Sequence, residues 1–166
     1  DVVILVGGLG TRLGSITKLT PKPLVKINNI SFLDQLIFKL FKYNFKNIYL
    51  MCSYRKEIFF NAYNNKVIHK TKIICIDEGT PKGTGGALFN IRKKIKKNFI
   101  LLNGDTFFDI NFNILNNKKL NRNNIFMCLT HKKNTINTHK LNNLEINKGK
   151  ISLSQSNTNI INGGIY

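Results

Sequence analysis

The 166-residue sequence predicts an α/β protein built on a mixed, mostly parallel sheet with helices on both faces. Two observations support this class. Short apolar runs alternate with segments whose apolar residues recur at helical spacing, which is the pattern of strands joined by helical crossovers. The runs are also apolar nearly throughout, as strands are when helices cover both faces of their sheet. A chain of this length can bury one core, so a single domain spanning 1–166 is expected.

The first two thirds of the chain carry the regular alternation. We expect strands at 2–6, 47–52, 72–76 and 99–103, and helices at 32–41, 54–63 and 84–97. The helix at 32–41 has the clearest beginning, because Ser31 can cap its first amides and Asp34 places an acid in its first turn. Its apolar residues recur at helical spacing and should pack on the sheet.

Beyond Asp109 the alternation is lost. We expect a short helix at 113–119, a strand at 125–130, a loop at 131–140 and a hairpin of 141–146 with 150–153. The last run, 160–166, looks like a strand cut off in mid-course. The fold is therefore expected to be truncated at its C-terminal end.

The formal charge of +18 raises the question of nucleic-acid binding. Against it, only four of the 26 basic residues are arginines, the side chain best suited to base and phosphate contacts. The lysines are scattered and aromatic residues do not interleave with them as on a stacking platform. We therefore expect no nucleic-acid partner, although the basic field should attract anionic substrates.

The apolar runs and the cysteines indicate where in the cell the protein is expected. No run approaches the roughly twenty apolar residues of a membrane span, so no membrane partner is expected. Cys52, Cys75 and Cys128 lie in apolar runs at wide spacing, which predicts reduced core thiols and a cytoplasmic protein.

The glycine-rich turn GGLGTRL (7–13) directly follows the first apolar run. Successive amides in such a turn can converge on an anion, and Arg12 and Lys22 are near enough in sequence to supply countercharge. The turn matches neither a P-loop, which needs Gly-Lys after four intervening residues, nor a dinucleotide fingerprint, whose glycines are spaced one residue closer. Phosphate binding and a purely steric role for the glycines both stay open at this point.

Asp105 follows the fourth expected strand in the sequence NGD (103–105). Ligands of parallel sheets bind beyond the carboxyl ends of the strands, where the glycine-rich turn should also lie. An aspartate there can bind Mg²⁺, which usually takes one or two carboxylates together with phosphate oxygens. The alternative is that Asp105 only turns the chain, but a phosphate-binding turn beside it favours the metal role.

A second glycine-rich segment, EGTPKGTGGAL (78–88), opens the helix expected at 84–97. Such a turn can offer backbone groups to the edge of a nucleobase and leaves the first helical amides open. The alternative is an ordinary loop in which Thr84 caps the helix.

Together these segments resemble the sugar-1-phosphate nucleotidyltransferases, the pyrophosphorylases that form nucleotide sugars. The resembling segments follow the family order: GGLGTRL (7–13) with PKP (21–23), GTPKGTGGAL (79–88), LLNGDTFFDI (101–110) and INGGIY (161–166). NGDTFFDI and INGGIY look most like the branch that transfers guanylyl groups to D-glycero-D-manno-heptose 1-phosphate. The resemblance implies a Rossmann-like nucleotide-diphospho-sugar transferase fold, with a nucleotide-binding half at 1–110 and a partial sugar-binding half at 111–166.

The resemblance also implies an activity. The chain would be a Mg²⁺-dependent enzyme that transfers a nucleoside monophosphate, GMP by preference, from a nucleoside triphosphate to a sugar 1-phosphate. A homo-oligomer is compatible with the resemblance. The implied catalytic residues are Arg12, Lys22 and Asp105, with Asp105 as the Mg²⁺ ligand. The implied substrate-binding residues are Gly8, Gly10 and Thr11 for the phosphates, Gly83, Thr84 and Glu78 for the base, and Asn162 and Gly163 for the sugar.

Three departures from the family pattern concern the sugar-binding half. The family's second metal-binding aspartate belongs to a later segment than this sequence contains. The segment 153–156 stands where the family has a Glu-Lys pair, and 136–139 replaces an aromatic-glycine segment. Two alternatives to the enzyme therefore stay open: a nucleotide-binding relative with weak catalysis or a gene remnant, and, less favoured, a basic nucleic-acid-binding module.

Overall fold

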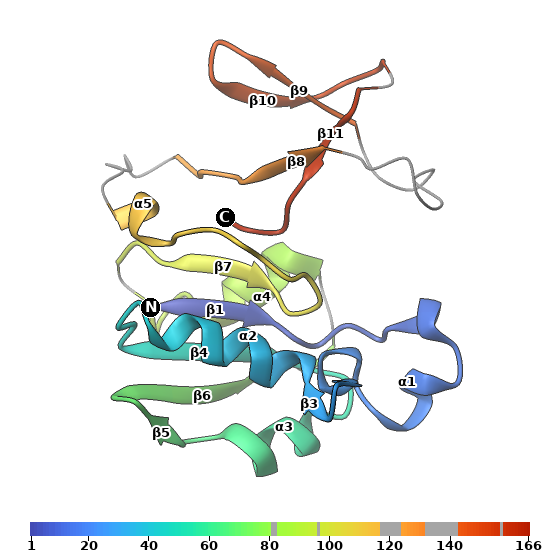
Figure 1. Cartoon of the computed structure of the whole chain (residues 1–166), viewed down its shortest axis with the longest axis vertical. Coiled ribbons are helices and arrows are strands. Elements are labelled where there is room, and N and C mark those ends of the chain that lie inside the picture. Colours follow the sequence, from blue (N-terminus) through green and yellow to red (C-terminus); the bar gives the residue numbers. More distant parts are fainter. Residues whose placement is uncertain (81–82, 96, 117–123, 132–142, 157) are drawn as a thin grey trace.

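A five-stranded sheet with the strand order β5-β6-β4-β1-β7 forms the centre of the molecule (Figure 1). The computed structural model describes residues 1–80, 83–95, 97–116, 124–131, 143–156 and 158–166. The parallel strands of the sheet are β1 (Val2–Leu5), β4 (Asn47–Cys52), β6 (Thr71–Asp77) and β7 (Ile100–Asn103). The short edge strand β5 (Val67–Ile68) pairs antiparallel with β6, so the sheet is mixed and mostly parallel, as predicted.

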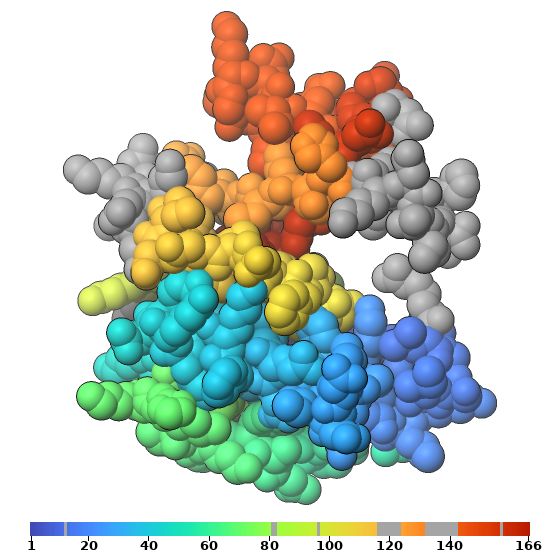
Figure 2. All heavy atoms as spheres, viewed as in Figure 1, coloured from blue at the N-terminus to red at the C-terminus, as the bar shows by residue number. Residues whose placement is uncertain are grey.

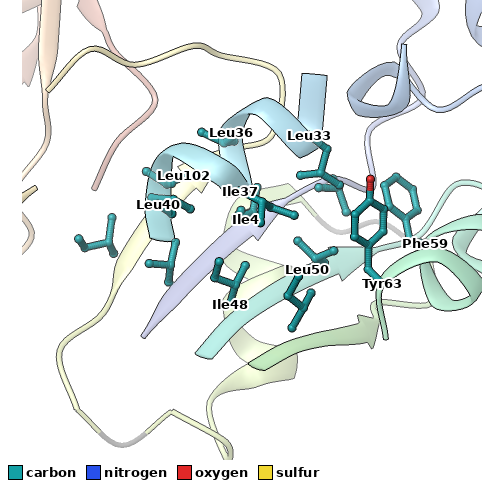
Figure 3. Close-up of a cluster of buried hydrophobic side chains, with 14 of the residues drawn as sticks. Ile4, Leu33, Leu36, Ile37, Leu40, Ile48, Leu50, Phe59, Tyr63 and Leu102 are labelled. Atoms are coloured by element: carbon teal, nitrogen blue, oxygen red, sulfur yellow. The ribbon is translucent and has the colours of Figure 1, made fainter. Parts of the chain in front are cut away.

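Helices cover both faces of this sheet, as the apolar runs predict. The helices α2 (Phe32–Phe41) and α3 (Lys56–Tyr63) pack on one face, and α4 (Gly83–Ile91) packs on the other. Successive strand residues point to opposite faces, so Ile4 lies in the cluster under α2 while Val3 lies in the cluster under α4. Figure 3 shows the larger cluster between α2, α3 and the sheet.

The N-terminus of α2 is fixed by the predicted cap. The Ser31 hydroxyl accepts a hydrogen bond from the Asp34 amide at 3.0 Å and donates one to the Asp34 carboxylate at 2.6 Å. The Tyr63 hydroxyl donates to the same carboxylate at 2.8 Å, which joins α3 to α2. Burial raises the pKa of Tyr63, so its hydroxyl remains a donor at all physiological pH values.

Several predicted boundaries are wrong by a few residues. The helix predicted at 84–97 ends at Ile91, although Ile95, four residues later, still packs in the same buried cluster. The helix predicted at 54–63 begins at Lys56, after Arg55 in the left-handed conformation (φ 49°). The predicted helix at 113–119 is α5 (Asn113–Asn116), and residues 117–119 lie outside the described part.

Short elements between the main ones were not predicted. They are η1 (Thr11–Leu13), α1 (Ile16–Leu19), η2 (Lys22–Leu24), and the two-residue strands β2 (Lys26–Ile27), β3 (Ile30–Ser31) and β5. The segment 11–20 projects from the body of the molecule on the side where β1 ends (Figure 1). This segment connects the glycine-rich turn to Lys22.

The C-terminal third forms two small antiparallel pairs. The hairpin of β9 (Leu144–Asn147) and β10 (Lys150–Leu153) confirms the prediction, with Gly149 at its turn (φ 76°). The second pair joins β8 (Leu129–His131) to β11 (Ile160–Asn162). The strand predicted at 125–130 thus begins only at Leu129. Residues 132–140 of the predicted loop and 141–142 of the predicted hairpin lie outside the described part.

The last residues return to the central sheet. The Leu101 and Tyr166 backbones exchange two hydrogen bonds of 2.9 Å, and the Asn103 amide donates to the Gly164 carbonyl at 3.0 Å. Ile165 is buried in the main core. Figure 2 shows the residues of this third, in orange and red, gathered at one end of the molecule beside the yellow residues that follow β7 in the chain.

None of the helices in the described ranges is long and apolar enough to cross a membrane. The three cysteines carry free thiols, and Cys52 and Cys75 are buried in the core. Burial and the neighbouring thiol raise the pKa of Cys52, which keeps it protonated and unreactive.

Candidate active site

The four parallel strands bring their carboxyl ends to one edge of the sheet. Hydrogen bonds continue between the strands just beyond their ends: Val6 donates to the Met51 carbonyl at 3.1 Å and Gly104 to the Leu5 carbonyl at 2.9 Å. The Glu78 amide donates to the Cys52 carbonyl at 2.8 Å in the same way. The loops that leave β1, β4, β6 and β7 therefore start side by side, where parallel sheets bind ligands.

Two glycines at this edge are required by close packing. A Cβ atom on Gly104 would lie 2.6 Å from the Leu5 carbonyl oxygen, and one on Gly7 would lie 3.0 Å from the Ser53 amide. At Gly7 and Gly104 the glycines therefore have the steric role that the sequence left open. Gly8 differs, because it is exposed and a Cβ there would meet no atom within 4 Å. Its amide is free to face a ligand.

Thr17 packs against the glycine-rich turn and fixes its shape. Gly10 has φ 64°, and a Cβ on it would lie 3.0 Å from the Thr17 methyl group and 3.1 Å from Lys22 Cβ. The buried Thr17 hydroxyl donates to the Gly10 carbonyl at 2.9 Å. The Tyr54 hydroxyl holds the next turn by donating to the Lys18 carbonyl at 2.9 Å. The turn is thus preformed.

Lys22 and Asp105 meet above this edge. The Lys22 ammonium lies 2.7 Å from Asp105 Oδ2, and the two side chains are 32% and 39% exposed. The pair joins residues 83 positions apart in the chain and places the carboxylate next to the residue that packs on Gly10. The structure thus brings the turn and Asp105 together at the same edge, as predicted.

The other predicted site residues fall into four groups: Thr11 with Arg12, Gly83 with Thr84, Asn162 with Gly163, and Glu78. Thr11 is exposed in η1 beside the turn, while the side chain of Arg12 lies outside the described part of the structure. Gly83 (φ 70°) and Thr84 begin α4 and are exposed.

Asn162 and Gly163 shape the chain where it turns back toward β7. The Asn162 side chain accepts a hydrogen bond from the Gly164 amide at 2.8 Å and donates to the Tyr166 hydroxyl. A Cβ on Gly163 would lie 2.8 Å from the Cys128 carbonyl oxygen. These contacts give both residues a structural role, and their contact with a sugar stays a prediction.

Glu78 is the half-buried acid at the end of β6. Desolvation raises the pKa of its carboxyl group, and the neighbouring Asp77 carboxylate raises it further. Asp77 stays ionised, because a hydrogen bond from Lys56 and one from the Gly79 amide lower its pKa. Within the described ranges the Glu78 carboxylate has no hydrogen-bond or ion-pair partner. It is therefore free to accept donors from a ligand.

The arrangement suits a hard cation held jointly by protein and substrate. No group of three or more His, Cys, Asp or Glu side chains in the described ranges is placed to hold a metal ion. Asp105 offers one exposed carboxylate beside the glycine-rich turn. This donor set fits Mg²⁺, which takes one or two carboxylates and completes its shell with phosphate oxygens and water.

Comparison with known proteins assigns the family. A model of the nucleotidyl transferase family matches residues 1–139. The chain belongs to this family.

The relatives of this nucleotidyl transferase include two curated enzymes. The D-glycero-alpha-D-manno-heptose 1-phosphate guanylyltransferase of Campylobacter jejuni is 38% identical over 171 residues, covering all of the chain and 74% of that protein. The protein of the same name from Aneurinibacillus thermoaerophilus is 37% identical over 109 residues, covering 65% of the chain and 47% of that protein.

Solved structures agree with this assignment. HddC from Yersinia pseudotuberculosis complexed with GMP-PN is 32% identical, with a TM-score of 0.69 over 99% of the chain and 74% of that structure. The UTP-bound UGPase from Acinetobacter baumannii is only 15% identical, yet its TM-score is 0.77 over 99% of the chain and 72% of that structure. The second likeness shows the fold alone.

The site of this nucleotidyl transferase is distinct from a groove of about 990 Å³ on the outer side of α2. That groove is lined by aromatic and basic side chains, and none of the predicted site residues contributes to it.

Three residues that support the site were not predicted. Thr17 and Tyr54 hold the glycine-rich turn, and Lys39 contacts the segment that follows Asp105. Their roles depend on contacts between residues distant in the sequence, so no local motif signals them. Thr17 lies in a largely polar stretch of the sequence, and its burial is visible only in the structure.

Proposed function

We propose that this nucleotidyl transferase moves a guanylyl group from GTP to a sugar 1-phosphate, with a heptose 1-phosphate as the favoured acceptor, and releases pyrophosphate. The observation that carries the proposal is the pairing of Lys22 with Asp105 above the preformed turn at Gly8–Gly10. The pair sets a cation and a carboxylate beside the turn, where the proposal puts the phosphates of GTP. The names of the heptose 1-phosphate guanylyltransferases support the choice of substrates.

The chemistry needs no general base. A sugar 1-phosphate oxygen is already anionic at neutral pH, so it can attack the α-phosphorus of the triphosphate directly. The protein's task is to align two anions and reduce their repulsion. The amide of Gly8 would bind the triphosphate, Lys22 would lie between the two phosphates, and Asp105 would hold Mg²⁺. The ion, when bound, neutralises charge on the phosphate oxygens.

Glu78 supports guanine as the base. A carboxylate presents two adjacent acceptors, and guanine is the common base whose Watson–Crick edge presents two adjacent donors, N1–H and the N2 amino group. Glu78 is half-buried, unpaired within the described ranges, and set at the ligand-binding edge beside the segment that starts α4. Uracil and thymine offer one donor between two acceptors, so a carboxylate would repel their oxygens.

Two other functions remain as outcomes of the test. The segment 153–156, where the family resemblance implies a Glu-Lys pair, includes the exposed end of β10 and supplies no cation. A relative that binds nucleotide with weak catalysis would fit this loss. The charge of +18 is the observation that favours nucleic-acid binding.

The test is a matrix of pyrophosphate release. Each of the four nucleoside triphosphates is combined with heptose, mannose or glucose 1-phosphate, with and without Mg²⁺. Release that requires GTP, a sugar 1-phosphate and Mg²⁺ supports the proposal. GTP binding without release supports the weak relative. Oligonucleotide binding with a steep salt dependence, not competed by GTP, supports the nucleic-acid module.

We also propose that the reaction takes place in the cytoplasm. The three free thiols, two of them deep in the core, suit a reducing compartment. Expression in a cytoplasmic and in an oxidising periplasmic compartment, followed by comparison of soluble yield and thiol content, tests this placement.

A further inference from the structure

The segment 106–110 carries the chain away from Asp105 without forming a helix or a strand. Its start is fixed because Gly104 is packed on the Leu5 carbonyl, and its middle is anchored by Phe108, which is 4% exposed. Between these anchors Asp105 and Phe107 are exposed. The direction in which the Asp105 carboxylate points therefore depends on what holds the segment.

Helix α2 holds it, chiefly through Lys39. The Lys39 ammonium donates to the Phe108 carbonyl and lies 2.9 Å from the Asp109 carboxylate. It also lies 4.6 Å from the centre of the Phe107 ring. The Lys39 side chain is only 15% exposed, whereas Asp109 is 97% exposed. Screening by water makes the ion pair weak, so the directional hydrogen bond to the Phe108 carbonyl is the main restraint.

Two further contacts from α2 and its end support the same segment. The Tyr43 hydroxyl donates to the Ile110 carbonyl at 3.1 Å. The Phe32 and Phe107 rings meet edge to face with their centres 6.4 Å apart. Lys39 is the central member of this set, because it alone touches Phe107, Phe108 and Asp109.

We propose that Lys39 is a positioning residue of the nucleotidyl transfer site: it holds segment 106–110 so that the Asp105 carboxylate stands opposite Lys22 and can receive Mg²⁺ together with the triphosphate. This inference rests on the function proposed above. Lys39 itself contacts neither Asp105 nor the glycine-rich turn, so its effect is transmitted through the backbone of residues 106–108. Loss of Lys39 should therefore impair the metal-dependent part of triphosphate binding and spare the part made by the turn.

The test compares three variants. Lys39→Met keeps the apolar stem and removes the ammonium, and Lys39→Arg restores a cation. Lys42→Met is the matched control, because Lys42 is exposed directly after α2 and lies over the Tyr43 ring; in the described ranges it makes no hydrogen bond to the segment's carbonyls, although its charge also acts on Asp109. Hydrogen–deuterium exchange of residues 105–110 reports the restraint without any ligand. Calorimetric titration with GTP, with and without Mg²⁺, reports the positioning.

In Lys39→Met we expect faster exchange at 105–110 and a loss of about tenfold in the affinity that Mg²⁺ adds for GTP, with binding in the absence of Mg²⁺ unchanged. Lys39→Arg should recover part of both effects, and Lys42→Met should resemble the wild type. Equal exchange in the two methionine variants overturns the proposal, as does faster exchange with an unchanged effect of Mg²⁺. A wild-type chain that binds no GTP refutes the proposed function, and with it the role given to Lys39, whatever the exchange shows.

Discussion

Replacing Thr17 by Val should loosen the glycine-rich turn without changing the volume of the side chain. Thr17 is 3% exposed, and its hydroxyl donates to the Gly10 carbonyl at 2.9 Å. Valine fills the same space and removes one of the two hydrogen bonds of this carbonyl, which also accepts from the Leu13 amide at 3.0 Å. The loss of one such hydrogen bond costs about 0.5–1.5 kcal/mol in the free energy of unfolding. For a chain of this size that corresponds to a fall of roughly 1–6 °C in Tm.

The effect on GTP binding should be comparable, in free energy, to the loss of stability. The amides of the turn must be held in one conformation to bind a triphosphate, so we expect the Kd for GTP to rise about tenfold. Thermal unfolding followed by circular dichroism measures the first quantity, and calorimetric titration measures the second. The titration is done at 25 °C or below, where the variant remains folded.

Thr17→Ser is the control for this prediction. Serine keeps the donor and removes only the methyl group that packs on Gly10, so it should bind GTP nearly as well as the wild type. If the serine variant loses as much affinity as the valine variant, packing rather than the hydrogen bond shapes the turn. An unchanged GTP affinity in Thr17→Val would refute the reasoning.

Four further substitutions test the edge of the sheet. Asp105→Asn should reduce Mg²⁺-dependent pyrophosphate release roughly 100-fold or more, while the free energy of unfolding falls by less than about 1 kcal/mol because the ion pair with Lys22 is partly exposed; full activity would exclude Asp105 from the metal site. Glu78→Gln should reduce the preference for GTP over UTP by roughly tenfold to a hundredfold, as read from the ratio of kcat/KM values. Because the folded-state pKa of Glu78 is raised, the wild type should lose stability as pH rises above the ordinary value of 4.5, and the glutamine variant should not; identical pH profiles would contradict this. Gly104→Ala should destabilise the fold by about 1–3 kcal/mol, since its Cβ would meet a carbonyl oxygen, whereas Gly8→Ala should leave Tm unchanged and weaken GTP binding.

The central sheet could be predicted because its signals are local. Apolar runs such as 47–52 match the observed strand at both ends, and Ser31 with Asp34 marks the start of α2. The short hairpin of β2 and β3 was missed although Asn28 and Asn29 both adopt positive φ at its turn. Two-residue strands contain too few positions for a period to be seen.

The site residues that could be predicted are those that belong to a recognisable local motif. The glycine-rich turn and Asp105 were expected at one edge because the ends of parallel strands converge there, and the distance of 2.7 Å between Lys22 and Asp105 confirms it. The roles of Thr17, Tyr54 and Lys39 could not be predicted, because each depends on a contact with another segment of the chain. Such contacts are fixed by tertiary packing and leave no pattern of spacing.

The pairing of Gly164–Tyr166 with β7 ties the C-terminal third of the chain to the strand that carries Asp105. Asn103 is held by the Gly164 carbonyl on one side, and two residues later the same backbone carries Asp105. If Asn162 and Gly163 bind the sugar phosphate, as the family resemblance implies, a shift of these residues on binding would be transmitted through this backbone pairing to the Asp105 carboxylate.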